Sequence, residues 1–283
     1  ANYPQLDNAR GVWNMKEVYD AVIGGYWPNA LSRGLFMGGA EPGASTVVDY
    51  VTLSATGNAT DFGDLTDARN FCGVNSSFTR GIATGGYDPG SAVDVIDYVT
   101  IMTTGNAADF GNLTVARGYT SGFSNSVRGI TTGGYTGSDS NVLDYITMAS
   151  VGNAIDFGNL TAAAYSIEGT ASPTRGITAG GMSPGIRNVI DFVEIATTGN
   201  AVDFGDLSGN RRTMGSASSS TKATFGGGAV PGNTNIIDTI TIASQGNAID
   251  FGDLSVTRSQ VAGTSNSVRG IFGGGKTPTI SNV

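Results

Sequence analysis

The sequence contains no histidine and a single cysteine, Cys72. The lack of histidine excludes Ser-His-Asp and Cys-His catalytic sites and metal sites that use imidazole ligands. A single cysteine can form neither an internal disulfide nor a cysteine-rich metal cluster. We expect Cys72 to be a small buried side chain, because a cysteine nucleophile needs a nearby base. No metal site and no cofactor are expected.

Charged residues are also scarce. They make up 13 % of the 283 residues, and 15 basic against 23 acidic side chains give a net charge of −8. Nucleic-acid binding needs a basic stripe, so no nucleic acid is expected as a partner. No apolar run approaches the ~20 residues of a membrane helix, so no membrane insertion is expected. Residues 1–4 do not have the pattern of a signal peptide.

Glycine, by contrast, is abundant, with 44 residues, and many of them lie in an internal repeat. The string Gly-Asn-Ala-x-Asp-Phe-Gly-Asp/Asn-Leu begins at Gly57, Gly105, Gly152, Gly199 and Gly246. The string Arg-Gly-x-x-x-Gly-Gly begins at Arg33, Arg80, Arg128, Arg175 and Arg269, and Lys222 stands in the same register. Successive copies of each string begin 47 or 48 residues apart when Lys222 is counted as the copy between Arg175 and Arg269. The chain is therefore a repeat array.

Each repeat is predicted to form four short strands. Residues 95–102 are rich in Val, Ile, Tyr and Thr, which favour strands. Gly105-Asn106 suits a hairpin, so 107–113 is expected to be the return strand, with further strands over 81–84 and 117–124. Four strands in about 47 residues fit one propeller blade. A β-solenoid is the main competing fold.

The layout resembles Kelch repeats, in which an apolar strand ends in Gly-Gly and is followed by a Tyr, an aromatic residue and an Arg. Gly85-Gly86, Tyr98, Phe110 and Arg117 match these positions, with Phe110 where Kelch repeats have Trp. The resemblance implies an all-β, Kelch-like β-propeller of about six four-stranded blades over residues 33–283.

Residues 1–32 are expected to form a separate N-terminal part. Residues 6–10 echo residues 65–69, so residues 1–6 are predicted to supply the strand that closes the last blade. The alternative is a chain cut from a longer array.

Residues 11–28 fit no repeat, and Asn14 is a suitable N-cap for a short helix over 15–23. This insertion is either a plug packed on one end of the propeller or a docking element that uses Trp13, Tyr19 and Trp27. Its sequence, beside Gly-Gly-rich repeats, is similar to a module of bacteriophage tail-fibre and virion proteins. That resemblance implies a structural or host-attachment role on a virus particle.

Ten aspartates recur at fixed register, and two neighbouring carboxylates could serve glycoside hydrolysis. They are Asp49, Asp97, Asp144, Asp191 and Asp238, and Asp61, Asp109, Asp156, Asp203 and Asp250. Because every repeat has them, we interpret them as structural acceptors of hydrogen bonds. The arginines that open the Gly-Gly strands are expected to pair with repeat carboxylates, the alternative being a ring of cations that binds an anion.

The loops after the Gly-Gly pairs vary, and a propeller gathers such loops on one face. We predict that Tyr87, Asp88, Tyr135, Asp139 and Arg187 bind a cell-surface glycan or protein, although plain connecting turns would also explain the variation. The predicted function is a non-enzymatic virion protein for host attachment, with other virion proteins as partners and an oligomer as an option. Alternatives are an extracellular carbohydrate-binding module and, less favoured, a polysaccharide-degrading enzyme.

Overall fold

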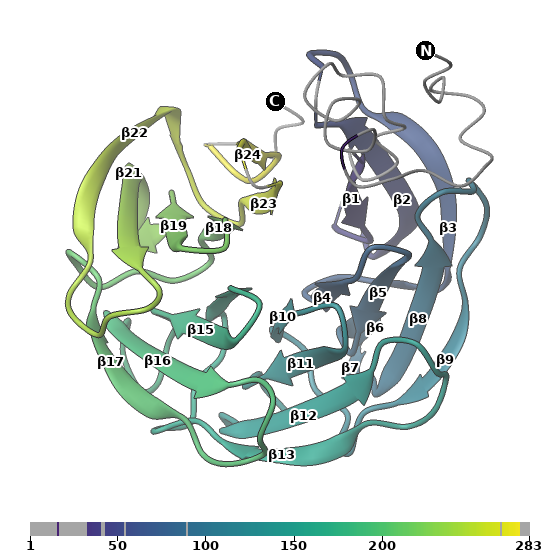
Figure 1. Ribbon diagram of the computed structural model, residues 1–283, viewed down its shortest axis with the longest axis horizontal. Coiled ribbons are helices and arrows are strands. Elements are labelled where there is room, and N and C mark those ends of the chain that lie inside the picture. Colours follow the sequence, from purple (N-terminus) through teal and green to yellow (C-terminus); the bar gives the residue numbers. More distant parts are fainter. Residues whose placement is uncertain are drawn as a thin grey trace. The chain divides into compact units, whose positions relative to one another are not determined.

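The computed structural model describes Lys16 and residues 33–277 except 41, 42, 54, 89 and 267. All its elements are strands, and five small antiparallel sheets are arranged as a β-propeller (Figure 1). The prediction of an all-β propeller is therefore confirmed. Within the described residues, no helix has the length and apolar character needed to span a membrane.

The strands of each repeat occupy four positions from the centre of the ring outward. The inner strands are β4 (Gly73–Ser76), β10 (Ser121–Ser124), β14 (Glu168–Ala171), β18 (Gly215–Ser218) and β23 (Ala262–Ser265). The second strands are β1 (Arg33–Met37), β5 (Arg80–Thr84), β11 (Arg128–Thr132), β15 (Arg175–Ala179), β19 (Lys222–Gly226) and β24 (Gly270–Gly273). The third strands are β2 (Ser45–Thr52), β8 (Val95–Thr100), β12 (Val142–Thr147), β16 (Val189–Glu194) and β21 (Gly232–Thr241).

The outer strands are β3 (Thr60–Arg69), β9 (Ala108–Asn112), β13 (Ile155–Asn159), β17 (Val202–Asp206) and β22 (Ile249–Arg258). Short loop strands are β6 (Tyr87–Asp88), β7 (Ser91–Ala92) and β20 (Ala229–Val230). The strands predicted around 81–84, 95–102, 107–113 and 117–124 are thus observed, each with shifted ends. The largest shift is at β10, which begins only after the chain has passed through a left-handed residue, Tyr119, at φ 54°.

Five blades form rather than the six that were predicted, and not all of them have four strands. The first blade is the three-stranded sheet β1-β2-β3, and β23 and β24 of the last repeat form a sheet of two strands. The second, third and fourth blades are the complete sheets β4-β5-β8-β9, β10-β11-β12-β13 and β14-β15-β16-β17, and the fifth contains β18, β19, β21 and β22. The sixth blade is not confirmed, because within the described residues the last repeat contributes only its two inner strands.

The two-stranded sheet nevertheless lies beside the first blade. Arg269 Nη1 donates a hydrogen bond to the carbonyl oxygen of Leu53 at 3.3 Å. The equivalent bond between the third and fourth blades runs from Arg128 Nη1 to the carbonyl oxygen of Ile195 at 3.0 Å. The last and first repeats are therefore joined by the same contact that joins neighbouring blades.

The insertion, apart from Lys16, lies outside the described residues. The predicted helix over 15–23 is not confirmed, and the closing strand over 1–6 stays a prediction. Trp13, Tyr19 and Trp27, the predicted docking residues, also lie outside the described part of the chain.

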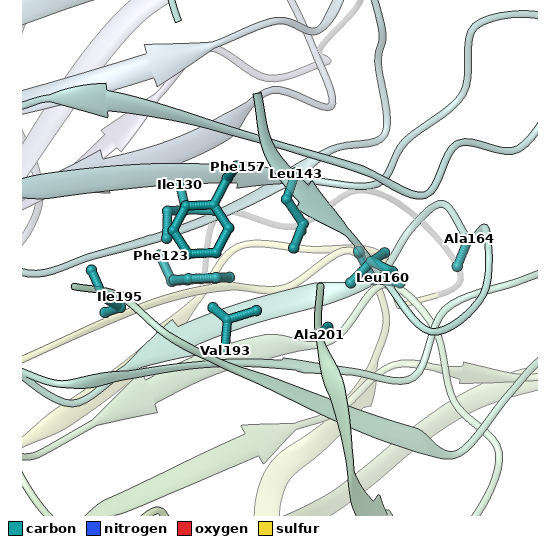
Figure 2. Packing of buried hydrophobic residues seen from close by; sticks show 10 residues of the cluster. Phe123, Ile130, Leu143, Phe157, Leu160, Ala164, Val193, Ile195 and Ala201 are labelled. Carbon is teal, nitrogen blue, oxygen red and sulfur yellow. The ribbon is translucent and has the colours of Figure 1, made fainter. Parts of the chain in front are cut away.

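The hydrophobic core is divided into clusters that lie between neighbouring blades. Figure 2 shows one such cluster, in which Phe123, Leu143 and Phe157 of the third blade face Val193 and the neighbouring residues of the fourth. Both faces of a blade are buried in this way, which explains why residues 95–101 have apolar side chains at both alternating sets of positions. Blade-to-blade burial is therefore the main hydrophobic contribution to stability.

The Gly-Asn-Ala string fastens each blade to the one before it. Gly152 N and Ala154 N donate to the carbonyl oxygens of Phe110 and Asn112 at 2.7 and 2.8 Å. Asn153 Oδ1 in turn accepts from Asn112 N at 3.1 Å. A Cβ at Gly111, whose φ is 146°, would lie 2.5 Å from the Gly152 carbonyl oxygen. The recurrent glycine after the phenylalanine is thus required by this close approach.

Buried Arg–Asp pairs form a second connection between blades. Arg117, which follows β9 of the second blade, places Nη2 2.9 Å from Asp144 Oδ2 on β12 of the third, and neither side chain is exposed. Equivalent pairs join Arg69 to Asp97 and Arg211 to Asp238. The interpretation as structural acceptors is confirmed for Asp97, Asp144 and Asp238.

The arginines that open the Gly-Gly strands behave differently from the prediction. Arg80 donates to the Met148 carbonyl oxygen at 2.9 Å, and its guanidinium carbon lies 4.6 Å from the centre of the Tyr98 ring. Arg175 does form an ion pair with a carboxylate, that of Glu194. The prediction of carboxylate pairing was wrong for Arg80 and Arg128, because each side chain lies over its own blade's aromatic ring and reaches a carbonyl in the next blade.

We expect Asp144→Ala to destabilise the protein by about 3–5 kcal/mol, because it leaves the Arg117 guanidinium buried without its counterion. Urea denaturation followed by circular dichroism measures the change. The matched control is Glu194→Ala, which breaks an ion pair whose side chains are 25 % and 49 % exposed and should cost about 1 kcal/mol or less. Equal losses for the two variants would contradict the assignment of Arg117–Asp144 as a structural pair.

Candidate functional site

The candidate site is built by the loops that follow the Gly-Gly pairs. Gly85 and Gly86 have φ values of 60° and 117°, and a Cβ on Gly85 would lie 2.5 Å from the Arg117 carbonyl oxygen. This turn delivers the next residue, Tyr87, into an antiparallel bridge with Asn70. The bridge of Tyr135 with Gly118 repeats the arrangement one blade further on. The glycine pairs therefore place one loop residue per blade beside the segment that precedes an inner strand.

That neighbouring segment contains a residue in the left-handed region in every described repeat. These residues are Phe71, Tyr119, Ser166, Thr213 and Gln260, with φ between 52° and 55°. Positive φ is uncommon for bulky side chains, and its recurrence shows that the turn belongs to the fold. What changes between repeats is the side chain, which is aromatic only in the first two.

Five aromatic rings form a continuous row, which we call the aromatic row. Tyr87 and Tyr135 are loop residues, Phe71 and Tyr119 are left-handed residues, and Tyr165 precedes the left-handed Ser166 and forms the antiparallel bridge to Met182. Phe71 and Tyr119 are stacked, with ring centres 4.2 Å apart and planes 22° apart. Tyr119 lies 5.3 Å from Tyr87 and 5.9 Å from Tyr165, and Tyr165 lies 5.5 Å from Tyr135. All five residues are partly exposed, so the row presents aromatic surface to solvent.

A pocket of about 310 Å³ opens beside one end of the aromatic row. Phe71, Tyr87 and Tyr119 line it together with Asn70 and the exposed Asp88. Partial burial raises the pKa of the Tyr119 phenol, and the neighbouring phenols of Tyr87 and Tyr165 raise it further. The Tyr119 hydroxyl therefore stays protonated at neutral pH and can donate a hydrogen bond. Apolar rings bordered by a few polar groups are typical of a small-ligand site.

The other end of the aromatic row continues into a polar contact. Tyr165 Oη donates to Met182 Sδ at 3.2 Å, and Arg212 Nη1 contacts the same sulfur at 3.2 Å. The row thus runs across several repeats rather than within one loop.

The structure brings three of the five predicted loop residues to this site. Tyr87 and Tyr135 are members of the aromatic row and Asp88 lines the pocket, while Asp139 lies at the side of Tyr135 through a backbone bridge. The Arg187 side chain is not part of the aromatic row or the pocket lining, and its Nη1 donates a hydrogen bond to the Ala163 carbonyl oxygen at 3.2 Å. Ligand binding by these residues stays a prediction.

Arg187 lies near the place where the third blade lacks its usual arginine. Ala164 occupies the position that Arg117 occupies one repeat earlier, and Asp191 is the aspartate that such an arginine would meet. Burial raises the pKa of the Asp191 carboxyl, and the positive charge of Arg187 opposes that rise. Arg187 therefore has a structural explanation, which is that its positive charge acts on the Asp191 carboxyl.

Sequence reasoning missed Phe71, Tyr119 and Tyr165. Residues 117–124 were predicted as one strand, which would have sent neighbouring side chains to opposite faces. The available signal was the alignment of Phe71 with Tyr119 one repeat apart, at a position where later repeats have Ser166 and Thr213.

No protein-family model matches the chain, and a search of curated proteins finds no similar sequence. The described residues contain no group of three or more Cys, Asp or Glu side chains placed to hold a metal ion.

One further ionisable group lies on an inner strand. Burial raises the pKa of the Glu168 carboxyl to about 8, and a carboxyl oxygen lies 2.8 Å from Ser216 Oγ on the neighbouring blade. Because the unfolded chain loses this proton near pH 4.5, stability falls as pH rises from about 4.5 to about 8 and then levels off.

We expect Glu168→Gln to remove this part of the pH dependence, since the amide keeps the contact with Ser216 Oγ without a titrating group. This titration changes the free energy of unfolding by at most about 1.4 kcal/mol per pH unit. Thermal melts of both proteins between pH 4 and pH 9 measure it, with the variant melting higher at pH 8 and equally at pH 4. Parallel curves across this range would contradict a buried, protonated Glu168.

Proposed function

We propose that the protein is a non-enzymatic attachment protein that binds a surface glycan through the aromatic row. The observation that supports this is the continuous row of five partly exposed rings beside a pocket. The C–H faces of a sugar ring pack on aromatic faces, while its hydroxyls bond to phenols, amides and carboxylates. Tyrosine suits this task because it offers a large contact area with few rotatable bonds.

The aromatic row explains how individually weak contacts with a glycan would add up to a useful affinity. Rings from successive repeats lie 4.2 to 5.9 Å from their neighbours, so an extended glycan can contact several of them at once. Several copies on one particle would add avidity without any new contact. We place the protein on a virus particle, as a tail-fibre or surface component, on the strength of the similarity of residues 11–28 to phage virion proteins.

A free, extracellular carbohydrate-binding module is the second candidate, because the aromatic row supports glycan binding in either location. The buried Arg–Asp pairs weigh against a glycan-degrading enzyme that would use these aspartates, since Asp97 and Asp144 are inaccessible and paired. Gold-labelled antibody viewed on particles by negative-stain microscopy separates the two locations. Label on fibres or heads supports the virion assignment, and label confined to cells or free protein supports the module.

We expect Tyr119→Ala to lower affinity for a bound oligosaccharide about tenfold, because Tyr119 contacts three other rings of the row. The measurement is binding to a panel of immobilised neutral and acidic oligosaccharides, followed by titration of the best one. The control is Phe78→Ala, which removes a ring that is 64 % exposed and outside the row. Equal affinity in Tyr119→Ala and the parent protein, or release of reducing ends by the parent, would refute the proposal.

A further inference from the structure

The aromatic row ends beside a positively charged side chain, that of Arg212. Arg212 and Tyr165 hold the same position one repeat apart, because each forms an antiparallel bridge with the residue that follows a Gly-Gly pair. The bridge partner is Met182 for Tyr165 and Ala229 for Arg212. Tyr165 Oη and Arg212 Nη1 both lie 3.2 Å from Met182 Sδ. The guanidinium of Arg212 is therefore the next polar group along the row after the Tyr165 ring.

The Arg212 guanidinium contacts only a weak acceptor. The thioether sulfur of Met182 carries no charge and is a poor acceptor of hydrogen bonds. Among the described residues, Arg212 Nε has no acceptor and no carboxylate lies within ion-pair distance of the side chain. Its neighbour Arg211, by contrast, is paired with Asp238. Because Arg212 is partly exposed, its positive charge is accessible to an anionic group of a bound molecule.

The anion that a single guanidinium matches best is a carboxylate. The N–H groups of a guanidinium lie in one plane and can donate to both oxygens of a carboxylate at once. A sulfate or phosphate ester presents three terminal oxygens, so one guanidinium leaves at least one of them without a donor. A carboxylate attached to a sugar ring also stays within reach of Arg212 while that ring packs on Tyr165.

We propose that the aromatic row binds an acidic oligosaccharide, and that Arg212 pairs with the carboxylate of a sugar that packs on Tyr165. This inference rests on the proposed glycan-binding function and specifies its substrate class.

The charges along the row give the bound oligosaccharide a direction. The exposed Asp88 lines the pocket at the other end of the row and would repel a carboxylate. The acidic sugar therefore lies at the Arg212 end, and a sugar without a carboxylate lies at the pocket. The chain as a whole carries a net charge of −8, so it does not attract acidic glycans non-specifically. Recognition of the carboxylate then depends on the local contact with Arg212.

The test compares acidic oligosaccharides with matched neutral ones. The probes are oligosaccharides of galacturonic acid, of mannuronic acid and of hyaluronan, each beside the same chain with its carboxyl groups reduced to primary alcohols. We expect the acidic probe that binds best to bind about tenfold more tightly than its reduced counterpart, because only the carboxylate can pair with Arg212. Raising the ionic strength should weaken binding of the acidic probe and leave that of the reduced probe unchanged. This comparison uses the parent protein, so it does not depend on the folding of a variant.

A pair of variants tests the residue itself. Arg212→Gln should lower the affinity for the acidic probe to that for the reduced probe, and should leave the affinity for the reduced probe unchanged. The matched control is Lys222→Gln, which removes an equal charge from an exposed residue outside the row and should change neither affinity. Arg212→Lys should recover only part of the preference, since an ammonium keeps the charge without the planar pair of donors.

Equal affinity for the acidic and reduced probes, or equal affinity of the parent and Arg212→Gln for the acidic probe, would overturn the role of Arg212. Glycan binding that Tyr119→Ala still weakens would then leave the proposed function standing. Preferential binding of sulfated dextran oligosaccharides, lost in Arg212→Gln, would overturn the carboxylate in favour of a sulfate ester. Binding of no probe, acidic or neutral, would overturn this inference and the proposed function together.

Discussion

The buried pairing of an arginine with the aspartate of the next blade is the constraint on which the ring depends. A carboxylate and a guanidinium that are both removed from water are stable only while they meet each other. Arg69, Arg117 and Arg211 are therefore fixed in position by Asp97, Asp144 and Asp238. Thr114 Oγ1 donates to Asp144 Oδ1 at 2.7 Å, so both oxygens of this carboxylate accept a hydrogen bond. These polar contacts and the apolar clusters together hold neighbouring blades against each other.

This rigid frame explains why the loop face can vary. The Gly-Gly turns and the left-handed residues recur, so the backbone beneath the loops is the same in each blade. Side chains at Tyr87, Tyr135 and Met182 then change without altering the frame. The aromatic row arises where the loop position, the left-handed position and the position before it carry aromatic residues in neighbouring repeats. In a binding surface of this kind, single side chains in the loops can differ between repeats while the backbone scaffold stays the same.

Much of the fold could be predicted from the sequence, because the repeat period and the strand propensities both follow from local patterns. The partners of the arginines could not be predicted. Arg80 and Arg117 look alike in the sequence, yet one lies over an aromatic ring and the other is buried against Asp144. The distinction depends on which blade each side chain enters, which is a property of packing. For the same reason, the contact between Tyr119 and Tyr165 could not be predicted, because the two rings come from different repeats. The number of complete blades could not be predicted either.

The contact between Arg269 and Leu53 differs from the rest in its distance along the chain. The hydrogen bonds between neighbouring blades join residues about 30 to 70 positions apart, whereas this one joins residues 216 positions apart. Each blade can therefore form against a neighbour already made, as in linear repeat proteins, and only the seam must bring distant segments together. Closing that loop carries the largest entropic cost in the ring. Opening the seam consequently returns more chain entropy than opening any other junction between described blades, which favours local unfolding at this point.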